Sequence, residues 1–425
     1  MYSMFKLLFI CLILISQCSV FSQISEEINP PNFIKTIIFN SKDEIDQFPI
    51  IKLNEPLFLS FDDLRGSDQD FYYKISYFNH DWSPSGLFKN DFITGFDNQR
   101  ISNFKSSFGT KQSYTHYELE LPNEKTKFLL TGNYMIEIYD QNDIVVFSRK
   151  FLIFSNNAIV NSAITSSLDL KKFTTHQAIK FNVKPLNISF QNPQNDIKVV
   201  ILQNYQWDFS IQNIKPQFII NQELQFYQDL ELLFEGGNEY YFFDTKDILA
   251  ESQNISFVSN ETQYQTYLHT NVERNLYPYS NTQDINGDFR VRTLSGFDNK
   301  TEADYTQVHF SLSKNKIFED ENIYVYGKFN NYSLSDENIM IFNPGLEIYE
   351  SDITLKQGFY NYKYVSKIGE NVLKKNKISG SHYNSENTFQ IFIYYRPIGN
   401  INDQLIGVSK PNSFKLSTSI NFENY

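Results

Sequence analysis

Cysteine, glycine and tryptophan are scarce in this sequence, and its net charge is negative. Its 425 residues include two Cys, 16 Gly and two Trp, and the formal net charge is −12. Clustered Lys and Arg neutralise nucleic-acid phosphates, so the acidic balance argues against a nucleic-acid partner. Both cysteines, Cys11 and Cys18, lie in the segment that we interpret below as a leader. The mature chain would therefore form no disulfide and could not use a thiol nucleophile.

Long apolar runs are missing after the N-terminal segment. That segment carries Lys6, then an apolar run over Leu7–Ile15, then a polar break before Ser22. This pattern is typical of a secretory signal peptide, here cleaved after Ser22. The run is too short to span a bilayer as a helix, and no later stretch is long enough. We expect an exported chain without a membrane span. Cys18 is a poor lipidation site because Gln17, not a small residue, precedes it.

Motifs for catalysis are missing as well. The histidines show neither the HxH nor the HExxH spacing that places two imidazoles on one metal. There is no GxSxG nucleophile elbow and no glycine-rich phosphate loop. The sequence therefore predicts no enzyme, no catalytic residue, no metal and no cofactor. The histidines are His80, His116, His176, His269, His309 and His382.

Aromatic residues, in contrast, are abundant. The chain has 40 Phe and 28 Tyr, and these residues favour strands, as do Ile and Val. Helical periodicity is weak throughout. One hydrophobic core rarely exceeds about 250–300 residues. The composition therefore predicts an all-β protein with tandem immunoglobulin-like or early-set β-sandwich domains after the signal peptide.

Short apolar or alternating runs bounded by turn residues suggest the domain limits. We expect the signal peptide at 1–22, an immunoglobulin-like sandwich at 23–155, a second sandwich at 156–300 and an early-set-like sandwich with a tail at 301–425. The clearest strands of the first domain are Phe33–Phe39, Pro56–Phe61, Phe71–Tyr77, Tyr114–Leu121, Gly132–Tyr139 and Ile144–Phe154. Those of the other two are Ala178–Val183, Ile197–Leu202, Glu239–Phe243, Tyr305–Leu312, Gly358–Val365 and Gln390–Tyr395.

A long segment between Phe71–Tyr77 and Tyr114–Leu121 stands out as the candidate binding site. Loops of more than about a dozen residues without regular structure are uncommon and tend to be functional. Arg and aromatic side chains are also frequent among interface hot spots. The alternatives are that its aromatic residues cap the end of a sandwich and that its Asp and Arg form a loop clasp. The candidate partner-binding residues are Asp81, Trp82, Phe92, Phe96, Asp97, Asn98 and Arg100.

Two acidic groups have both a functional and a structural interpretation. Asp284, Asn286 and Asp288 resemble half of a calcium loop, but Gly287 comes too early, and an Asn-Gly turn is favoured. Asp62-Asp63, with Asp68 and Asp70 nearby, could act as paired acid–base carboxylates in a pocket. Asp and Gly are ordinary turn residues, so we expect this second group to form a solvated turn.

Three successive runs carry a resemblance to a known family. They are SFDDLRGSDQDFYYKISYFNHDW, GFDNQRISNFKSSFGTKQSYTHYELELPN and TGNYMIEIYDQNDIVVFSRKF. In this order they resemble the plug protein of the type IX secretion system. The resemblance implies a periplasmic, non-enzymatic β-protein whose partner is the large outer-membrane β-barrel translocon. Such a plug binds the periplasmic opening of the barrel and keeps it closed when idle.

A second, partial resemblance lies near the C-terminus and leaves an alternative open. The run VYGKFNNYSLSDENIMIFNPGLEIYESDITLKQGFYNYKYV is similar to the early-set sandwich of glycogen-binding modules. Tyr332 stands near the Trp of their G-x-F-N-x-W strand start, with Tyr360 and Tyr362 further along, and the sugar-stacking Trp pair is not evident. These tyrosines could also be cross-strand packing partners. The alternative function is therefore a carbohydrate-binding or surface adhesion module.

Overall fold

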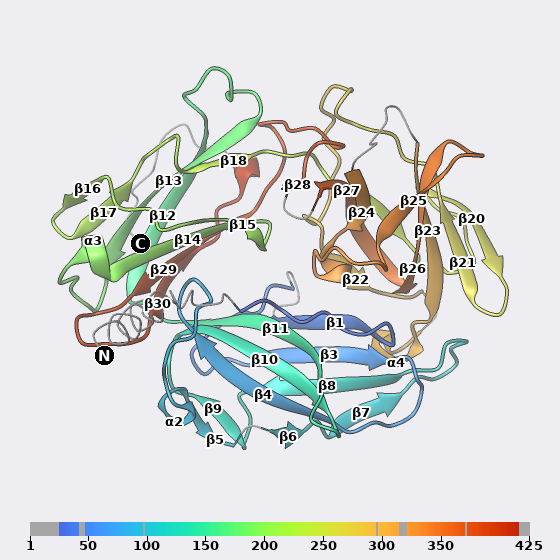
Figure 1. The fold of residues 1–425 in the computed structure, drawn as a ribbon, viewed down its shortest axis with the longest axis horizontal. Coiled ribbons are helices and arrows are strands. Elements are labelled where there is room, and N and C mark those ends of the chain that lie inside the picture. Colours follow the sequence, from blue (N-terminus) through green and yellow to red (C-terminus); the bar gives the residue numbers. More distant parts are fainter. Residues whose placement is uncertain are drawn as a thin grey trace, which may run out of the picture.

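Alternation of aromatic and polar residues sets the strands of the first domain. In β4 (Phe71–Phe78) every second side chain from Phe71 to Tyr77 is buried, as period-2 burial requires. The computed structural model describes residues 25–41, 47–96, 98–294, 296–313, 321–369 and 372–415. It is almost entirely β, with three lobes, and the predicted all-β class of sandwich domains is confirmed (Figure 1). The expected leader, with Cys11 and Cys18, lies outside the described residues.

Two sheets face each other in the first domain. One has the order β1-β3-β8-β7, and the other has the order β2-β11-β10-β4-β6. Buried side chains from both sheets, such as Phe61 and Tyr134, form one core between them. The strands are β1 (Ile34–Ser41), β2 (Ile50–Lys52), β3 (Leu57–Asp63), β6 (Gln99–Arg100), β7 (Asn103–Ser106), β8 (Thr115–Leu121), β10 (Gly132–Asp140) and β11 (Val145–Phe154).

The segment between β4 and β8 has regular structure of its own, unlike the irregular loop expected from the sequence. After a turn, it contains the short helix α2 (Lys89–Phe92) and β5 (Ile93–Gly95), and it also supplies β6 and β7. β5 pairs with β9 (Thr126–Phe128) in a separate small sheet. Backbone pairing therefore holds this segment against the sandwich along much of its length.

The second domain combines strands from distant parts of the sequence. One sheet has the order β12-β13-β17-β16, with β18 also paired to β13, and the other has the order β15-β14-β29-β30. The strands are β12 (Ala158–Ser166), β13 (His176–Pro185), β14 (Ile197–Gln203), β15 (Gln206–Gln212), β16 (Phe218–Ile220), β17 (Glu223–Phe226), β18 (Leu233–Glu235), β29 (Phe389–Tyr395) and β30 (Gln404–Ser409); helix α3 (Pro193–Asp196) precedes β14.

The third domain is a ten-stranded sheet that curls around its own core. Its main order is β19-β27-β24-β25-β26-β23-β21-β20, with β22 and β28 also paired to β27. The strands are β19 (Tyr241–Asp244), β20 (Ile255–Asn260), β21 (Tyr264–Leu268), β22 (Phe289–Val291), β23 (Tyr305–Ser313), β24 (Glu321–Tyr326), β25 (Ile339–Asn343), β26 (Ile348–Lys356), β27 (Gly358–Ile368) and β28 (Val372–Lys374); the short helices are α4 (Asn299–Glu302), η1 (Lys328–Asn330) and η2 (Ser413–Lys415).

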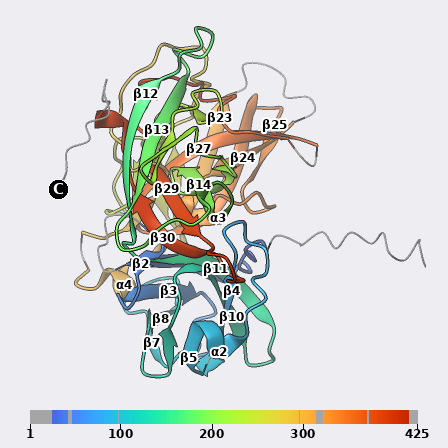
Figure 2. The same ribbon diagram turned by 90° about the vertical axis from the view of Figure 1, so that its left-hand side faces the viewer.

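The second domain contains two strands from the end of the chain, β29 and β30, in addition to the strands that precede the third domain. The expected third domain, 301–425, would have contained β29 and β30, but β29 pairs with β14 along seven residues. The third domain is thus inserted between β18 and β29 of the second. β30 lies against β10 and β11 of the first domain (Figure 2). None of the helices in the described residues has the length and apolar character needed to cross a membrane.

Candidate functional site: the junction of the three domains

Trp82 joins the first domain to the second. It follows β4 in a tight turn, with a φ of 63° and its N–H donating to the Asn79 carbonyl at 3.0 Å. Its indole is only 2% exposed. The ring meets that of Trp207, in β15, edge-on at 5.0 Å between centroids. This contact belongs to an apolar cluster shared by β4, β14 and β29, so desolvation holds the two domains together.

A buried charged cluster reinforces the same interface. His80 Nδ1 lies 2.8 Å from Asp403 Oδ2, and Arg396 Nε donates to Asp403 Oδ1 at 2.9 Å. Arg396 also donates to Asn79 Oδ1 at 2.8 Å. The carboxylate of Asp403 is fully buried. Burial by itself opposes ionisation, but the hydrogen bonds from His80 and Arg396 hold the pKa of Asp403 well below its ordinary value.

A second charged cluster joins the first domain to the third. Asp62, in β3, accepts hydrogen bonds from Lys356 Nζ at 2.7 Å and from the Tyr305 hydroxyl at 2.6 Å. His116 Nδ1 lies 2.6 Å from its other carboxylate oxygen. Burial opposes ionisation of Asp62, yet Lys356 and His116 hold its pKa below the ordinary value. The expected solvated turn was therefore wrong for Asp62 and Asp63, which have no exposed surface. It agrees with Asp68, which is exposed, and with Asp70, which is partly exposed.

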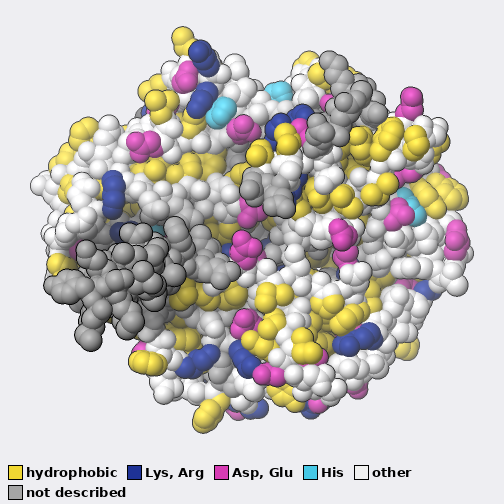
Figure 3. Space-filling view, viewed as in Figure 1, with side chains coloured by type: hydrophobic (Ala, Val, Ile, Leu, Met, Phe, Trp, Pro, Cys, Tyr) yellow, Lys and Arg dark blue, Asp and Glu magenta, His cyan; other side chains and the backbone are white. Residues whose placement is uncertain are grey.

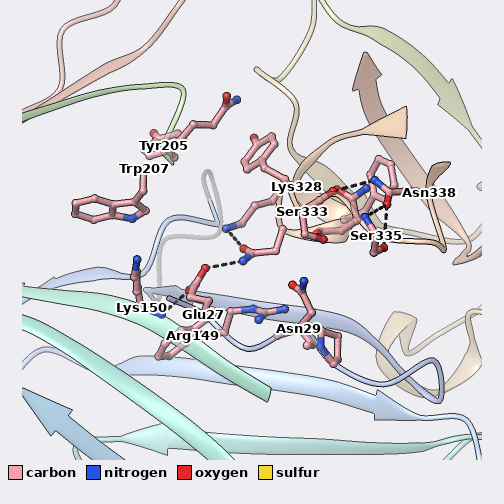
Figure 4. A pocket seen from close by; sticks show the side chains of 18 of the residues that line it. Glu27, Asn29, Arg149, Lys150, Tyr205, Trp207, Lys328, Ser333, Ser335 and Asn338 are labelled. Atoms are coloured by element: carbon pink, nitrogen blue, oxygen red, sulfur yellow. Dashed lines mark hydrogen bonds between the residues drawn. The ribbon is translucent and has the colours of Figure 1, made fainter. Parts of the chain in front are cut away.

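A cavity of about 990 Å³ lies where the three domains meet. The first domain and the N-terminal segment contribute Glu27, Asn29, Arg149 and Lys150 to its lining (Figure 4). Tyr205 and Trp207 of the second domain line another side, and the stretch from Lys328 to Asn338 of the third domain lines the side opposite them. A volume of this size is in the usual range for ligand sites.

Glu27 connects two of the domains across the cavity floor. Its Oε1 accepts from the Lys150 backbone N–H at 2.6 Å, and its Oε2 accepts from Asn331 Nδ2 at 2.6 Å. Burial opposes ionisation of this carboxyl, but the charges of Arg149 and Lys150 hold its pKa below the ordinary value. The N-terminal segment is thereby fixed between the first and third domains.

The candidate residues of the long segment separate into distinct environments. Asp81 and Trp82 line the cavity, and Asp81 Oδ1 accepts from the Ser83 N–H at 3.0 Å. Phe92 is 4% exposed and packs in the core of the first domain, so it offers almost no surface to a partner. Phe96, Asn98 and Arg100 are exposed at the far side of that domain. Asp97 lies outside the described residues.

Arg100 forms an ion pair, as the loop-clasp alternative expected, but its partner is Asp70. Arg100 Nε donates to Asp70 Oδ1 at 2.6 Å, and both side chains are substantially exposed. Phe96 is 77% exposed, and Phe88, on the other side of α2, is 81% exposed. The predicted residues therefore lie at the domain junction, in the core of the first domain and on its exposed surface. The exposed aromatic group is defined as Phe88, Phe96, Asn98 and Arg100.

Sequence reasoning missed several residues of the junction. Trp207 had a usable signal because it is one of only two tryptophans. Glu27 and Lys356 had none, because isolated charged residues are usually exposed. Their role depends on partners that are hundreds of residues away: 304 for Glu27 with Asn331 and 294 for Lys356 with Asp62.

The remaining candidates take structural positions. Asn286 and Gly287 have φ values of 56° and 84°, which agrees with the favoured Asn-Gly turn. Within the described residues, no group of three or more His, Cys, Asp and Glu could hold a metal. The tyrosines proposed for sugar stacking are buried: Tyr332 is 8% exposed, Tyr360 1% and Tyr362 0%. They pack as the alternative interpretation expected, with Tyr362 stacked on Tyr241 across the β19–β27 pair.

Comparison with known proteins assigns the first domain. Residues 34–155 match the family model described as Type 9 secretion system plug protein 1st domain. Over these residues the chain is similar to the first domain of the type 9 secretion system plug proteins. The family is named for a plug of a secretion system, not for an enzyme. The matched residues contain every strand of the first sandwich, including the surfaces that carry Trp82 and Asp62.

The chain is also similar to a solved structure along most of its length. A hypothetical protein from Parabacteroides merdae ATCC 43184 superposes with a TM-score of 0.87 at 29% sequence identity. The alignment covers 91% of this chain and 98% of that one. No curated protein matches the chain. The similarity therefore extends to the second and third domains, beyond the segment that the family model describes.

Proposed function

We propose that this protein is a non-enzymatic periplasmic plug. It binds the periplasmic opening of the outer-membrane barrel of the type IX secretion system and keeps that barrel closed when idle. The observation that carries the proposal is the match of residues 34–155 to the first domain of the plug family. A wide protein-conducting pore leaks small solutes unless something obstructs it, and an obstructing protein needs shape and rigidity, not chemistry.

The domain interfaces supply that rigidity. The first domain is fixed to the second through Trp82 and Asp403, and to the third through Asp62. Domains within a chain commonly move unless their interface is large and apolar. Here a broken buried ion pair would leave an uncompensated charge, which is strongly unfavourable. The body of the plug therefore behaves as one unit.

The exposed aromatic group on the first domain supports a docking role. Phe88 and Phe96 flank α2 and β5 and are more than three-quarters exposed. Asn98 and Arg100 follow them along the same segment. Aromatic and Arg side chains are enriched among interface hot spots. We assign the contact with the barrel to this group, not to the buried Phe92.

A pull-down from native outer membranes tests the proposal. Tagged mature protein is incubated with detergent-solubilised outer membranes, and the proteins that co-purify are identified. We expect a very large β-barrel protein in stoichiometric amount. Phe88→Asp combined with Phe96→Asp should abolish this recovery while leaving the free protein folded. Leu170→Asp is the matched control, because Leu170 is 89% exposed on the second domain. A free periplasmic monomer in cells that contain the translocon would contradict the plug function.

A further inference from the structure

We propose that the cavity at the domain junction is a binding site for an extended, basic segment of a partner protein. The inference concerns the cavity alone, so it holds whether or not the partner is the secretion barrel. It goes beyond closure of a pore, because it assigns a second contact to this protein, away from the aromatic group of the first domain.

The net charge of the cavity lining is negative. Glu26, Asp208 and Asp336 line the cavity and are exposed. Glu26 and Asp208 share one cation, Lys150, with the buried Glu27. Acidic side chains are visible near the centre of this face, between the domains (Figure 3). Complementary charge favours encounter with a basic segment and disfavours an acidic one.

The cations of the lining are engaged within the protein. Lys35 pairs with Glu337 at 2.8 Å, and Arg149 donates to the Ile28 carbonyl. The Lys150 ammonium lies 4.6 Å from the centroid of the Trp82 ring. Arg149, Lys150 and Lys328 all act on the buried Glu27. The lining holds six carboxylates against four cations, so its net charge is negative. The carboxylates are Glu26, Glu27, Asp81, Asp208, Asp336 and Glu337, and the cations are Lys35, Arg149, Lys150 and Lys328.

Two wall residues favour a peptide over a small cation. Trp82 and Gln206 line the cavity, and each is 2% exposed. The donor Trp82 Nε1 and the acceptor Gln206 Oε1 have no hydrogen-bond partner among the described residues. Such buried orphan groups are rare and costly. A peptide backbone supplies both a carbonyl acceptor and an N–H donor, whereas a cation supplies donors only.

The chain already binds extended backbone at this place. Its own N-terminal segment crosses the cavity floor, with the Ser25 N–H donating to the Trp82 carbonyl at 3.1 Å. Ser148 N–H donates to the Ile28 carbonyl at 3.1 Å, and Ile28 N–H donates to Ser148 Oγ at 2.7 Å. The open volume lies next to this segment. Half-buried Tyr205 and Trp207 can cover the aliphatic stems of Lys or Arg.

Intrinsic fluorescence gives a direct assay without a label. The only tryptophans in the sequence, Trp82 and Trp207, both line the cavity. The probes are blocked hexapeptides with three Lys or Arg residues alternating with apolar residues, and a matched set with Glu in place of each basic residue. We expect a saturable change in tryptophan emission with the basic set only. The affinity should weaken as salt rises, because salt screens exposed charges.

Charge-removing variants identify the carboxylates responsible. Glu26→Gln combined with Asp208→Asn should weaken binding of the basic peptides about tenfold. Glu124→Gln, an exposed carboxylate outside the cavity lining, should leave binding unchanged. If circular dichroism shows that the double variant is misfolded, Asp336→Asn alone provides the same comparison. No saturable response, an equal response to the Glu peptides, or full affinity in the folded variants would each overturn the proposal.

Discussion

The Lys356 ammonium lies 2.7 Å from the Asp62 carboxylate, although 294 residues separate the two in sequence. Lys356 is at the end of β26 in the third domain, and Asp62 is near the end of β3 in the first. Both side chains are at most 1% exposed. A buried pair of this kind adds little net stability over an apolar pair, but it makes separation of the partners costly.

Replacing Lys356 alone should therefore destabilise the protein strongly. Lys356→Met leaves the Asp62 carboxylate buried without its cation. We expect the free energy of unfolding to fall by about 3–5 kcal/mol, measured by urea denaturation. Lys300→Met is the control: Lys300 also pairs with a carboxylate, that of Glu118, but its side chain is 60% exposed. It should cost at most about 1 kcal/mol. Equal effects of the two changes would contradict the view that the buried contact between Asp62 and Lys356 holds the first and third domains together.

Lowering the pH should weaken the domain interfaces, because it protonates the buried carboxylates of Asp62 and Asp403. The pKa values of Asp62 and Asp403 are lowered in the folded protein, against about 3.9 for an unfolded Asp. A carboxyl group with a lowered folded pKa contributes stability above its unfolded pKa and loses it as the pH falls toward the folded value. We expect the free energy of unfolding to decline below about pH 4–5. Asp403→Asn should flatten this decline, and an unchanged pH profile in that variant would argue against the assignment.

Truncation of Trp82 should loosen the first domain from the second. Trp82→Ala empties the space beside Trp207, and large aromatic-to-Ala changes in cores cost about 3–5 kcal/mol. Trp82→Phe keeps most of the apolar contact and should cost clearly less. Calorimetry checks both variants. A single transition at the wild-type temperature in Trp82→Ala would show that the interface does not depend on this ring.

The composite second domain should respond to changes near the C-terminus. Ile391, in β29, is fully buried in the core that β13 and β14 share. Ile391→Ala should cost about 2–5 kcal/mol and reduce hydrogen-exchange protection in β14. Ile401→Ala is the control, since Ile401 is 56% exposed in the loop before β30, and it should stay within about 0.5 kcal/mol. Unaltered protection in β14 would contradict the shared sheet.

The buried tyrosines should act on stability and not on sugar binding. Tyr362→Ala removes a fully buried ring that contacts Tyr241, Phe310 and Tyr364. We expect a loss of about 3–5 kcal/mol, as for other large aromatic truncations. A panel of soluble polysaccharides should bind neither the wild type nor the variant. Binding by the wild type that disappears in Tyr362→Ala would restore the carbohydrate function.

The local alternation of buried and exposed residues was sufficient to predict the fold class and most strands. Alternation in Phe71–Tyr77 predicted β4 almost to the residue, and Gly132–Tyr139 predicted β10 equally well. Period-2 burial is a property of neighbouring residues, so it can be read without knowledge of the rest of the chain. The Asn-Gly turn at Asn286 was predictable for the same reason, because it depends on local backbone conformation.

The candidate site was only partly predictable. The segment after β4 was expected to form one binding surface, but its residues lie in different environments: Trp82 is at a domain interface, Phe92 is in a core and Phe96 faces solvent. Asp62 was misjudged because a pair of aspartates before Arg and Gly is typical of an exposed turn. Lys356, from another domain, donates a hydrogen bond to Asp62 and offsets the cost of burying its charge.

The sequence by itself determined that this chain is built from β-strands, where most of them lie, and which family its first domain resembles. The tertiary structure decided which strands share a sheet, as with β29 and β14, and which charges are buried together, as with Asp62 and Lys356. The physical reason is range. Strand formation depends on alternation between neighbours, whereas strand partners, ion pairs and the junction cavity depend on contacts between residues far apart in the chain.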